Sequence, residues 1–128
     1  MCYENRSAAG WPAQAGYGMA APRPGRRVRG SRTGRPIMAA LDLLGRRWAL
    51  RVLWELRRGP VNFRGLRERC DAMSPSVLNQ RLVELRATGI VERHLDGGYR
   101  LTASGASLLH ALAPLHDWAR RWTGGGAV

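Results

Sequence analysis

Hydroxyl and amide side chains gather on one face of residues 73–89. This face carries Ser76, Asn79, Gln80, Val83 and Glu84. At about 100° per residue in a helix, Ser76, Gln80 and Val83 point away from the apolar stripe of the segment, and the other two flank them. Short polar side chains of this kind can hydrogen-bond base edges in the major groove of DNA. The alternative is an ordinary solvated helix face.

The same segment carries the signals of a helix start and a helix end. Ser74 can accept hydrogen bonds from the free N–H groups of the first turn, and Pro75 fits the first helical position. Gly89 can adopt the left-handed conformation that closes a helix. The apolar stripe, spaced i, i+4 and i+7, consists of Leu78, Leu82 and Leu85. The polar face therefore stands on a helix whose other side packs into a core.

The chain is strongly basic. Its 128 residues carry a net charge of +12, and all 21 basic residues are arginine. A surplus of this size favours an anionic partner, of which nucleic acid is the commonest. The absence of lysine excludes a phosphate-loop lysine, a Schiff-base lysine and a Ser-Lys catalytic pair. The length predicts one compact domain.

The other reactive side chains show no pattern of an enzyme or a metal site. Cys2 and Cys70 form no Cys-x-x-Cys pair, and His94, His110 and His116 have no His-x-x-x-His spacing. A Gly-x-Ser-x-Gly elbow and paired carboxylates are also missing. We therefore expect no metal, no cofactor and no enzymatic activity. We interpret Cys70 as a small packed residue, with a reactive thiol as the alternative if it is exposed.

Residues 1–35 differ from the rest in composition. They contain seven Arg, six Gly and three Pro, and Val28 is their only Val, Ile, Leu or Phe. Such a segment buries too little apolar area to offset its chain entropy, which predicts a disordered arm. Its arginines concentrate between Arg23 and Arg35, where they could add salt-sensitive, sequence-independent affinity for phosphates. The alternative is an extension without a role.

Residues 36–123 have the pattern of a small helical domain with one hairpin, followed by a flexible tail over 124–128. We expect helices at about 36–44, 47–58, 63–70 and 74–88, a hairpin over 90–101 and a helical region over 102–122. A short extended piece lies around Val61-Asn62, and Pro114 should kink or divide the last region. Either Asp96-Gly97 or Gly97-Gly98 could occupy the hairpin turn. The fold class is mainly α with a small β-hairpin.

This order of elements predicts a winged helix-turn-helix. In that fold one helix lies across the DNA backbone, the next enters the major groove, and the hairpin reaches a flanking minor groove or phosphates. Arg93 and Arg100 lie on the two hairpin strands near the turn, so we expect them to reach phosphates. A solvated sheet face is the alternative for both.

The C-terminal helical region carries a heptad-like apolar seam. The seam consists of Leu108, Leu112, Leu115, Trp118 and Trp122. It could pack on the core of its own domain or on a second copy. We expect a two-fold interface built with the first helix, which contributes Leu41, because the core is small and both tryptophans lie near the chain end. A dimer would set two recognition helices about 34 Å apart, one turn of B-DNA.

Several motifs resemble those of one family. Gly45-Arg46-Arg47-Trp48 is similar to its Gly-Gly-Lys-Trp turn, and Phe63-Arg64-Gly65-Leu66 to its Phe-Asn-Glu-Leu. Residues 74–82 with Leu85 resemble its recognition helix, Gly89-Ile90-Val91-Glu92-Arg93 its first wing strand, and Tyr99-Arg100-Leu101-Thr102 with Gly105 the exit from its wing. With Trp118 near the end, these motifs resemble the HxlR-type winged-helix transcription regulators, relatives of the MarR group, over about residues 36–122.

The resemblance implies a homodimeric, DNA-binding transcription regulator, usually a repressor, acting on a near-palindromic operator. The residues it implies for the major groove are Ser74, Ser76, Asn79 and Gln80. It also implies phosphate contacts by Arg47 and Arg81, and wing contacts by Arg93 and Arg100. The helical phase of Arg81 supports its role less well, and an intramolecular ion pair, for instance with Glu55, is the alternative. The resemblance also implies a possible small-molecule effector, whose identity is unknown.

Two departures from the family pattern matter. Many members carry a cysteine directly before the proline that opens the first helix, and some use it to sense oxidants or aldehydes. That position is Arg35 here, so thiol sensing is not available there. The wing is also short, without a proline-containing insertion between Leu95 and Tyr99. This weakens the expectation of deep minor-groove reading.

We therefore expect a cytoplasmic, nucleoid-associated, sequence-specific regulator that binds double-stranded DNA and no membrane. The absence of a long apolar run and of a disulfide framework favours this compartment. The alternative function is a winged-helix module for protein assembly, in which the positive charge gives only incidental, nonspecific affinity for DNA.

Overall fold

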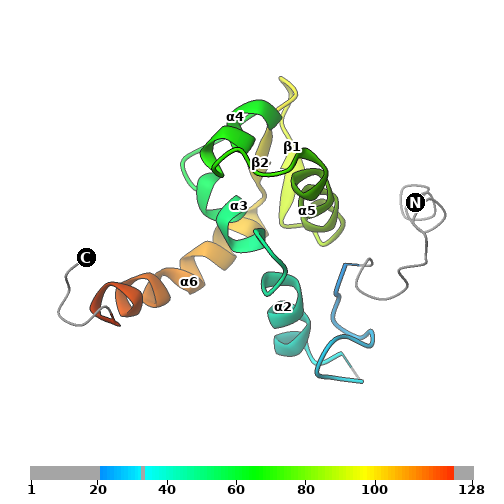
Figure 1. Cartoon of the computed structure of the whole chain (residues 1–128). Helices are drawn as coiled ribbons and strands as arrows, with labels where there is room; N and C mark the ends of the chain where they lie inside the picture. Colours follow the sequence, from blue (N-terminus) through cyan, green and yellow to red (C-terminus); the bar gives the residue numbers. More distant parts are fainter. Residues whose placement is uncertain (1–20, 33, 123–128) are drawn as a thin grey trace.

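The structure, a computed structural model, describes residues 21–32 and 34–122. Its elements are α2 (Pro36–Leu44), α3 (Ala49–Glu55), α4 (Phe63–Arg69), α5 (Pro75–Ala87), β1 (Val91–Arg93), β2 (Tyr99–Leu101) and α6 (Ala103–Trp122). In this part of the chain the helices and the two-stranded antiparallel sheet follow one another in the expected order (Figure 1). The prediction of a mainly helical fold with a small hairpin is confirmed.

The core lies between α3, α4, α5 and the hairpin. Its most deeply buried leucines are Leu53, Leu56, Leu66, Leu78, Leu82 and Leu85. Burial of one such side chain stabilises a fold by about 1.5–3 kcal/mol. Three of these leucines come from α5, so the apolar stripe predicted for this helix is confirmed. The packing fixes the position of α5 and leaves its outer side to solvent.

The helix α3 is shorter than the expected 47–58. Trp48 has φ 73° and ψ −5°, which is the left-handed region, so the helix begins only at Ala49. A left-handed backbone at a non-glycine residue costs of order 1–3 kcal/mol and persists where packing holds it. Trp48 packs against the core cluster, which supplies that support.

The hairpin turn differs from both expected alternatives. β1 and β2 pair with Val91 opposite Leu101 and Arg93 opposite Tyr99. Beyond them the N–H of His94 donates to Gly98 O at 2.7 Å, and the N–H of Gly97 donates to His94 O at 2.9 Å. The loop therefore has three residues, 95–97, with the glycine at φ 94°. A turn closed by a left-handed glycine is a common three-residue connection.

A further extended residue joins the hairpin. The N–H of Val61 donates to Tyr99 O at 2.9 Å, and the N–H of Tyr99 donates to Val61 O at 2.8 Å. The short extended piece expected around Val61-Asn62 is thus present. It ties the hairpin to the start of α4 and so fixes the base of the wing.

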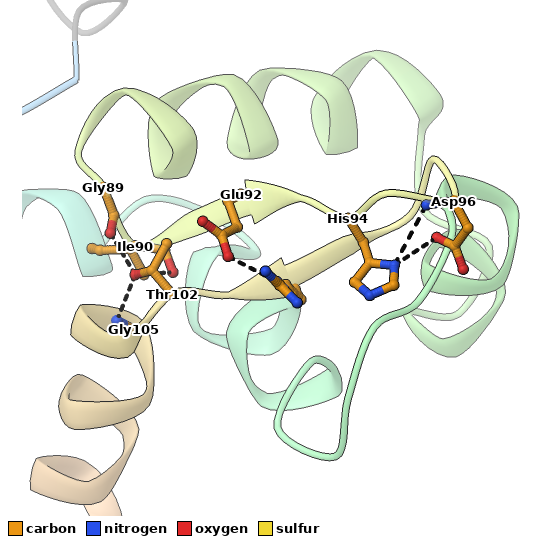
Figure 2. A network of polar contacts seen from close by, with 8 residues as sticks. Gly89, Ile90, Glu92, His94, Asp96, Thr102 and Gly105 are labelled. Carbon is orange, nitrogen blue, oxygen red and sulfur yellow. Dashed lines mark hydrogen bonds and ion pairs between the residues drawn. The ribbon is translucent and has the colours of Figure 1, made fainter.

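The helix α6 runs without a break through Pro114. The expected division at this proline does not occur, and α6 extends away from the other helices (Figure 1). The helix is anchored at its first turn by Thr102, whose Oγ1 donates to Gly89 O at 2.6 Å and accepts from the N–H of Gly105 at 3.0 Å (Figure 2). No helix in residues 21–32 and 34–122 has the length and apolar character of a membrane span.

The described part of the arm folds back onto the domain. Arg23 Nη2 donates to Ala87 O at 2.9 Å, and the N–H of Arg29 donates to Asp42 Oδ2 at 3.2 Å. The expectation of disorder is therefore not met for residues 21–32, 34 and 35. Composition gave no sign of this, because the contacts use backbone and charged groups instead of apolar side chains. The predictions for residues 1–20 and for the tail 124–128 lie outside the described residues.

Candidate nucleic-acid interface

The helix α5 carries polar side chains on the side away from the core. Ser76 and Asn79 are exposed, and Gln80 is half-buried. Ser74 is exposed too, and its Oγ accepts the N–H of Val77 at 3.4 Å and lies 3.1 Å from the Oγ of Ser76. The predicted cap by Ser74 is therefore present. The cap satisfies a backbone donor of the first turn and holds the hydroxyl pair at the end of the helix that bears the polar face.

The buried side of α5 is wider than its leucine stripe. Glu84 is only 2% exposed, so the expectation that it flanks the outer face is wrong. Its Oε2 accepts a hydrogen bond from Arg46 Nη1 at 2.9 Å, and its Oε1 lies 3.4 Å from Arg81 Nε. A buried carboxylate needs such cations because loss of water strongly penalises an unpaired charge.

Arg81 does not lie where a phosphate contact was expected. Its side chain is 10% exposed and faces Glu84. Burial lowers the pKa of Arg81, the charge of Glu84 opposes this shift, and the charge of Arg46 adds to it. Arg81 forms an intramolecular ion pair, which was the alternative expectation. Its partner is Glu84 and not Glu55. Arg81 is thus removed from the residues available to a phosphate.

The turn between α4 and α5 is held by arginine side chains. Asp71 and Ala72 have φ 59° and 56°, two consecutive non-glycine residues in the left-handed region. Arg67 Nε donates to Met73 O at 2.7 Å, and Arg51 Nη1 donates to Asp71 Oδ2 at 3.3 Å. The hydrogen bond to the Glu55 carboxylate is the main reason that the pKa of Arg51 is raised. These bonds hold a strained turn and thereby set the angle between α4 and α5.

Two further exposed arginines are candidates for phosphate contacts. Arg47 is exposed in the turn between α2 and α3, a position compatible with the phosphate role implied by the motif. Arg86 is exposed in the last turn of α5, and the sequence interpretation missed it. It follows Asn79 by seven residues, which places both on the same side of a helix. The same periodicity that selected Asn79 could have found it.

The two wing arginines have partners within the hairpin. Arg93 Nη1 donates to the hydroxyl of Tyr99 at 3.0 Å, and its Cζ lies 4.9 Å from the ring centroid. Arg100 Nε donates to Glu92 Oε2 at 2.7 Å, an exposed pair marked by a dashed line in Figure 2. Both arginines are exposed, so their remaining N–H groups face solvent at the surface of the wing.

The wing as a whole carries little charge. Residues 91–101 contain two arginines and two acids, so their net charge is zero with neutral histidine. Asp96 Oδ1 accepts the N–H of Gly98 at 3.1 Å and lies 3.0 Å from His94 Nδ1 (Figure 2). The backbone N–H of Gly98, followed by His94, lowers the pKa of Asp96, which keeps this carboxylate ionised at the tip. The wing therefore offers less attraction to phosphates than its arginines alone suggest.

Apolar side chains are exposed on α2 and α6, where the dimer interface was expected. Leu41, Leu115, Trp118 and Trp122 are 55%, 50%, 49% and 71% exposed, and Leu112 is half-buried. The rings of Trp118 and Trp122 stack with centroids 5.2 Å apart. Ile37 on α2 is 63% exposed and extends the same set. Exposed apolar side chains on these two helices are the candidates for an interaction surface.

Cys70 is fully buried in the core cluster. Burial raises the pKa of its thiol, and the nearby charge of Arg51 only partly opposes this. The interpretation as a packed residue is therefore confirmed, and the alternative of an exposed reactive thiol is not. In residues 21–32 and 34–122, no three His, Cys, Asp or Glu side chains lie together in a way that could hold a metal ion.

Known proteins share this fold and its motifs. Residues 43–126 match the family model described as HxlR-like helix-turn-helix. The HTH-type transcriptional regulator YodB of Bacillus subtilis is 32% identical over 87 residues, which cover 63% of this chain and 78% of that protein. The uncharacterized HTH-type transcriptional regulator YvaP of the same organism is 30% identical over 89 residues, 65% of this chain and 82% of that protein.

Solved structures agree with the sequence comparison. Quinone-bound YodB from B. subtilis superposes with a TM-score of 0.63 at 32% identity and covers 67% of this chain and 96% of that one. A possible HxlR family transcriptional factor from Thermoplasma volcanium gives a TM-score of 0.61 at 27% identity, over 69% of this chain and 84% of that one. The helix-turn-helix fold of this chain thus has counterparts among known regulators. The chain belongs to the HxlR-like helix-turn-helix family of transcriptional regulators.

Proposed function

We propose that this regulator acts as a homodimer that binds a near-palindromic operator in double-stranded DNA and represses transcription from it. The observation that carries the proposal is the exposed pair Ser76 and Asn79 on a helix whose opposite side is locked into the core. Rigid support matters because base contacts require side chains held close to their bonding geometry. In this proposal Ser74, Ser76, Asn79 and Gln80 contact base edges, and Arg47, Arg86, Arg93 and Arg100 contact phosphates.

The second copy binds through α2 and α6. Support comes from the exposed apolar side chains Leu41, Leu115, Trp118 and Trp122, which a monomer would leave in water. Burial of this surface against a second copy favours association by about 25 cal/mol per Å² of apolar area. A two-fold dimer would present two copies of α5 about one turn of B-DNA apart. Repression then follows if the bound dimer excludes RNA polymerase from the promoter.

An effector of this chain has no thiol directly before Pro36 to react with, unlike in some relatives. Arg35 is an exposed arginine directly before Pro36, and Cys70 is buried. The quinone in the YodB structure shows that one relative binds a small molecule. We propose that any effector of the present chain changes the dimer or the position of α5 by noncovalent binding.

Selection of duplexes from a random pool with the full-length protein tests the proposal. We expect enrichment of an inverted repeat whose half-site centres lie about 10 base pairs, or a multiple, apart. A mobility shift on that duplex should then survive physiological salt, whereas a shift on random DNA should not. Enrichment of no sequence, with only salt-erasable binding, would support the assembly alternative and overturn the proposal. A reporter gene placed behind the selected operator gives the sign of regulation.

A further inference from the structure

The positive charge of the described chain concentrates outside the wing. Residues 23–32, which we name the arginine loop, contain five arginines and no acid. The hairpin residues 91–101, with two arginines and two acids, carry no net charge. The matched family segment, residues 43–126, does not include the arginine loop. A dense run of positive charge without any acid therefore lies outside the matched segment.

The arginine loop is closed on itself by backbone hydrogen bonds. The N–H of Val28 donates to Ser31 O at 2.9 Å, and the N–H of Ser31 donates to Val28 O at 3.0 Å. At its ends the N–H of Gly25 donates to Gly34 O at 2.9 Å. A Cβ on Gly34 would lie 2.2 Å from the backbone O of Arg26, so this closure requires glycine. A closed loop has already lost much of the chain entropy that a free tail would lose on binding.

Two hydrogen bonds attach the arginine loop to α5 and α2. Arg23 Nη2 donates to the carbonyl of Ala87, the last residue of α5, and the N–H of Arg29 donates to Asp42 of α2. In Figure 1 the loop lies beside α2 and at the end of α5. The helix α5 has 13 residues, which corresponds to about 20 Å. The loop is thus held within roughly one helix length of the polar face.

Four of the five arginines of the loop are exposed, and the fifth, Arg23, is half-buried and bonded to Ala87. Arg26, Arg27 and Arg32 are exposed, and the side chain of Arg29 is 79% exposed. The Nε of Arg29 lies 3.9 Å from Asp42 Oδ1, too far for a hydrogen bond, so its charge is only weakly engaged there. Guanidinium binds phosphate oxygens with two parallel N–H bonds, and its weak hydration favours such pairing. Phosphate is therefore the chemistry that this surface fits.

We propose that the arginine loop is a second DNA-contacting surface, which binds backbone phosphates between the two half-sites of the operator. This inference rests on the proposed function. The loop lies between α5 and α2, and α2 belongs to the surface that we place at the two-fold axis. It therefore faces the operator centre, whereas the tip of the wing points away from α2 (Figure 1). Contacts of this kind raise affinity for every sequence and carry no base readout.

Substitution of two loop arginines in the full-length protein tests this inference. The variant R26Q/R27Q removes two charges from the loop, and the control R57Q/R58Q removes an adjacent exposed pair after α3. Affinity for the operator and for random duplex is measured over a series of salt concentrations. We expect the slope of log K against log salt to be flatter in R26Q/R27Q by about 1.8 for each bound protomer. The reason is that two phosphate contacts are lost per protomer, and each contributes about 0.9 to the slope. The ratio of operator to random affinity should not change.

Ethylation of the phosphates locates the contact. In the wild type, ethylation of phosphates at the operator centre should interfere with binding, and in R26Q/R27Q this interference should disappear. If R26Q/R27Q keeps the slope and the central interference of R57Q/R58Q, the loop proposal is overturned while the proposed function stands. If the wild-type protein shows no operator preference, both proposals fail. All four substituted side chains are exposed, so we expect both variants to fold. Thermal unfolding of both variants checks this.

Discussion

Arg46 Nη1 donates to Glu84 Oε2 at 2.9 Å, which joins the turn after α2 to the recognition helix α5. Their side chains are 9% and 2% exposed, so the pair lies in the interior. Asp42 on α2 lies 3.9 Å from Arg46, and Arg81 faces the other oxygen of Glu84. Two cations and two anions thus balance in one buried cluster. The cluster ties α5 to α2, the helix that we place in the dimer interface.

Removal of one member of this cluster should be costly. In Arg46→Met, Glu84 keeps only Arg81 as a partner, and we expect a loss of about 2–4 kcal/mol in the free energy of unfolding, near the low end for a broken buried ion pair. Denaturant unfolding measures this loss. The double variant R46M/E84Q removes the stranded charge and should recover part of the stability. Equal stability of R46M and the wild type would show that the pair does not form.

The buried thiol of Cys70 should resist chemical labelling. In a C2S background, which leaves Cys70 as the only thiol, the native protein should react with a thiol reagent on the order of a thousandfold more slowly than the denatured protein. Labelling of the native protein at the denatured rate would contradict the burial of Cys70.

The same thiol makes stability depend on alkaline pH. Burial raises the pKa of Cys70, so the folded state holds the thiol proton more tightly than the unfolded state. Its contribution to stability is fully present below the ordinary thiol pKa and is lost as the pH rises through the folded pKa. The free energy of unfolding should therefore fall on the alkaline side. In Cys70→Ala, which lacks the thiol, the part of this decline that comes from Cys70 should be absent.

A charge placed on the exposed apolar surface of α6 should dissociate the proposed dimer. Trp118→Asp puts a carboxylate where the second copy is expected to pack, and we expect dimerisation to weaken about 30-fold or more, as for an interface hot spot. Sedimentation equilibrium measures this change. Leu95→Asp, at the fully exposed tip of the wing, is the matched control and should leave the dimer intact. A wild-type protein that stays monomeric at high concentration would contradict the dimer proposal.

The sequence predicted the recognition helix well because its signals are local. The serine cap, the proline at the first position and the leucine spacing all act within one turn or one face, and each is present in the structure. The order of the elements followed in the same way from turn residues and periodicity. The predicted boundaries differed by a few residues where backbone conformation, as at Trp48, overrode a helical pattern.

The sequence could not assign the charged residues on the flank of α5. Helical phase placed Glu84 outside and left Arg81 ambiguous, whereas the structure buries both. The reason is that Arg46 comes from another element, and its guanidinium makes burial of Glu84 favourable. Such a pairing joins residues 38 positions apart, so no local pattern reveals it. The attachment of the arm through Arg23 and Arg29 was missed for the same reason.

The central claim is that the outer face of α5 reads base sequence, and one comparison tests it directly. Affinities of the wild type, S76A/N79A and the control R57Q/R58Q, whose substitutions lie after α3, are measured on the selected operator and on a scrambled duplex at the same salt concentration. We predict that S76A/N79A loses about 1–3 kcal/mol of discrimination for each base contact removed, while its affinity for the scrambled duplex stays unchanged. An equal loss on both duplexes, or a full operator preference in the variant, would contradict the claim.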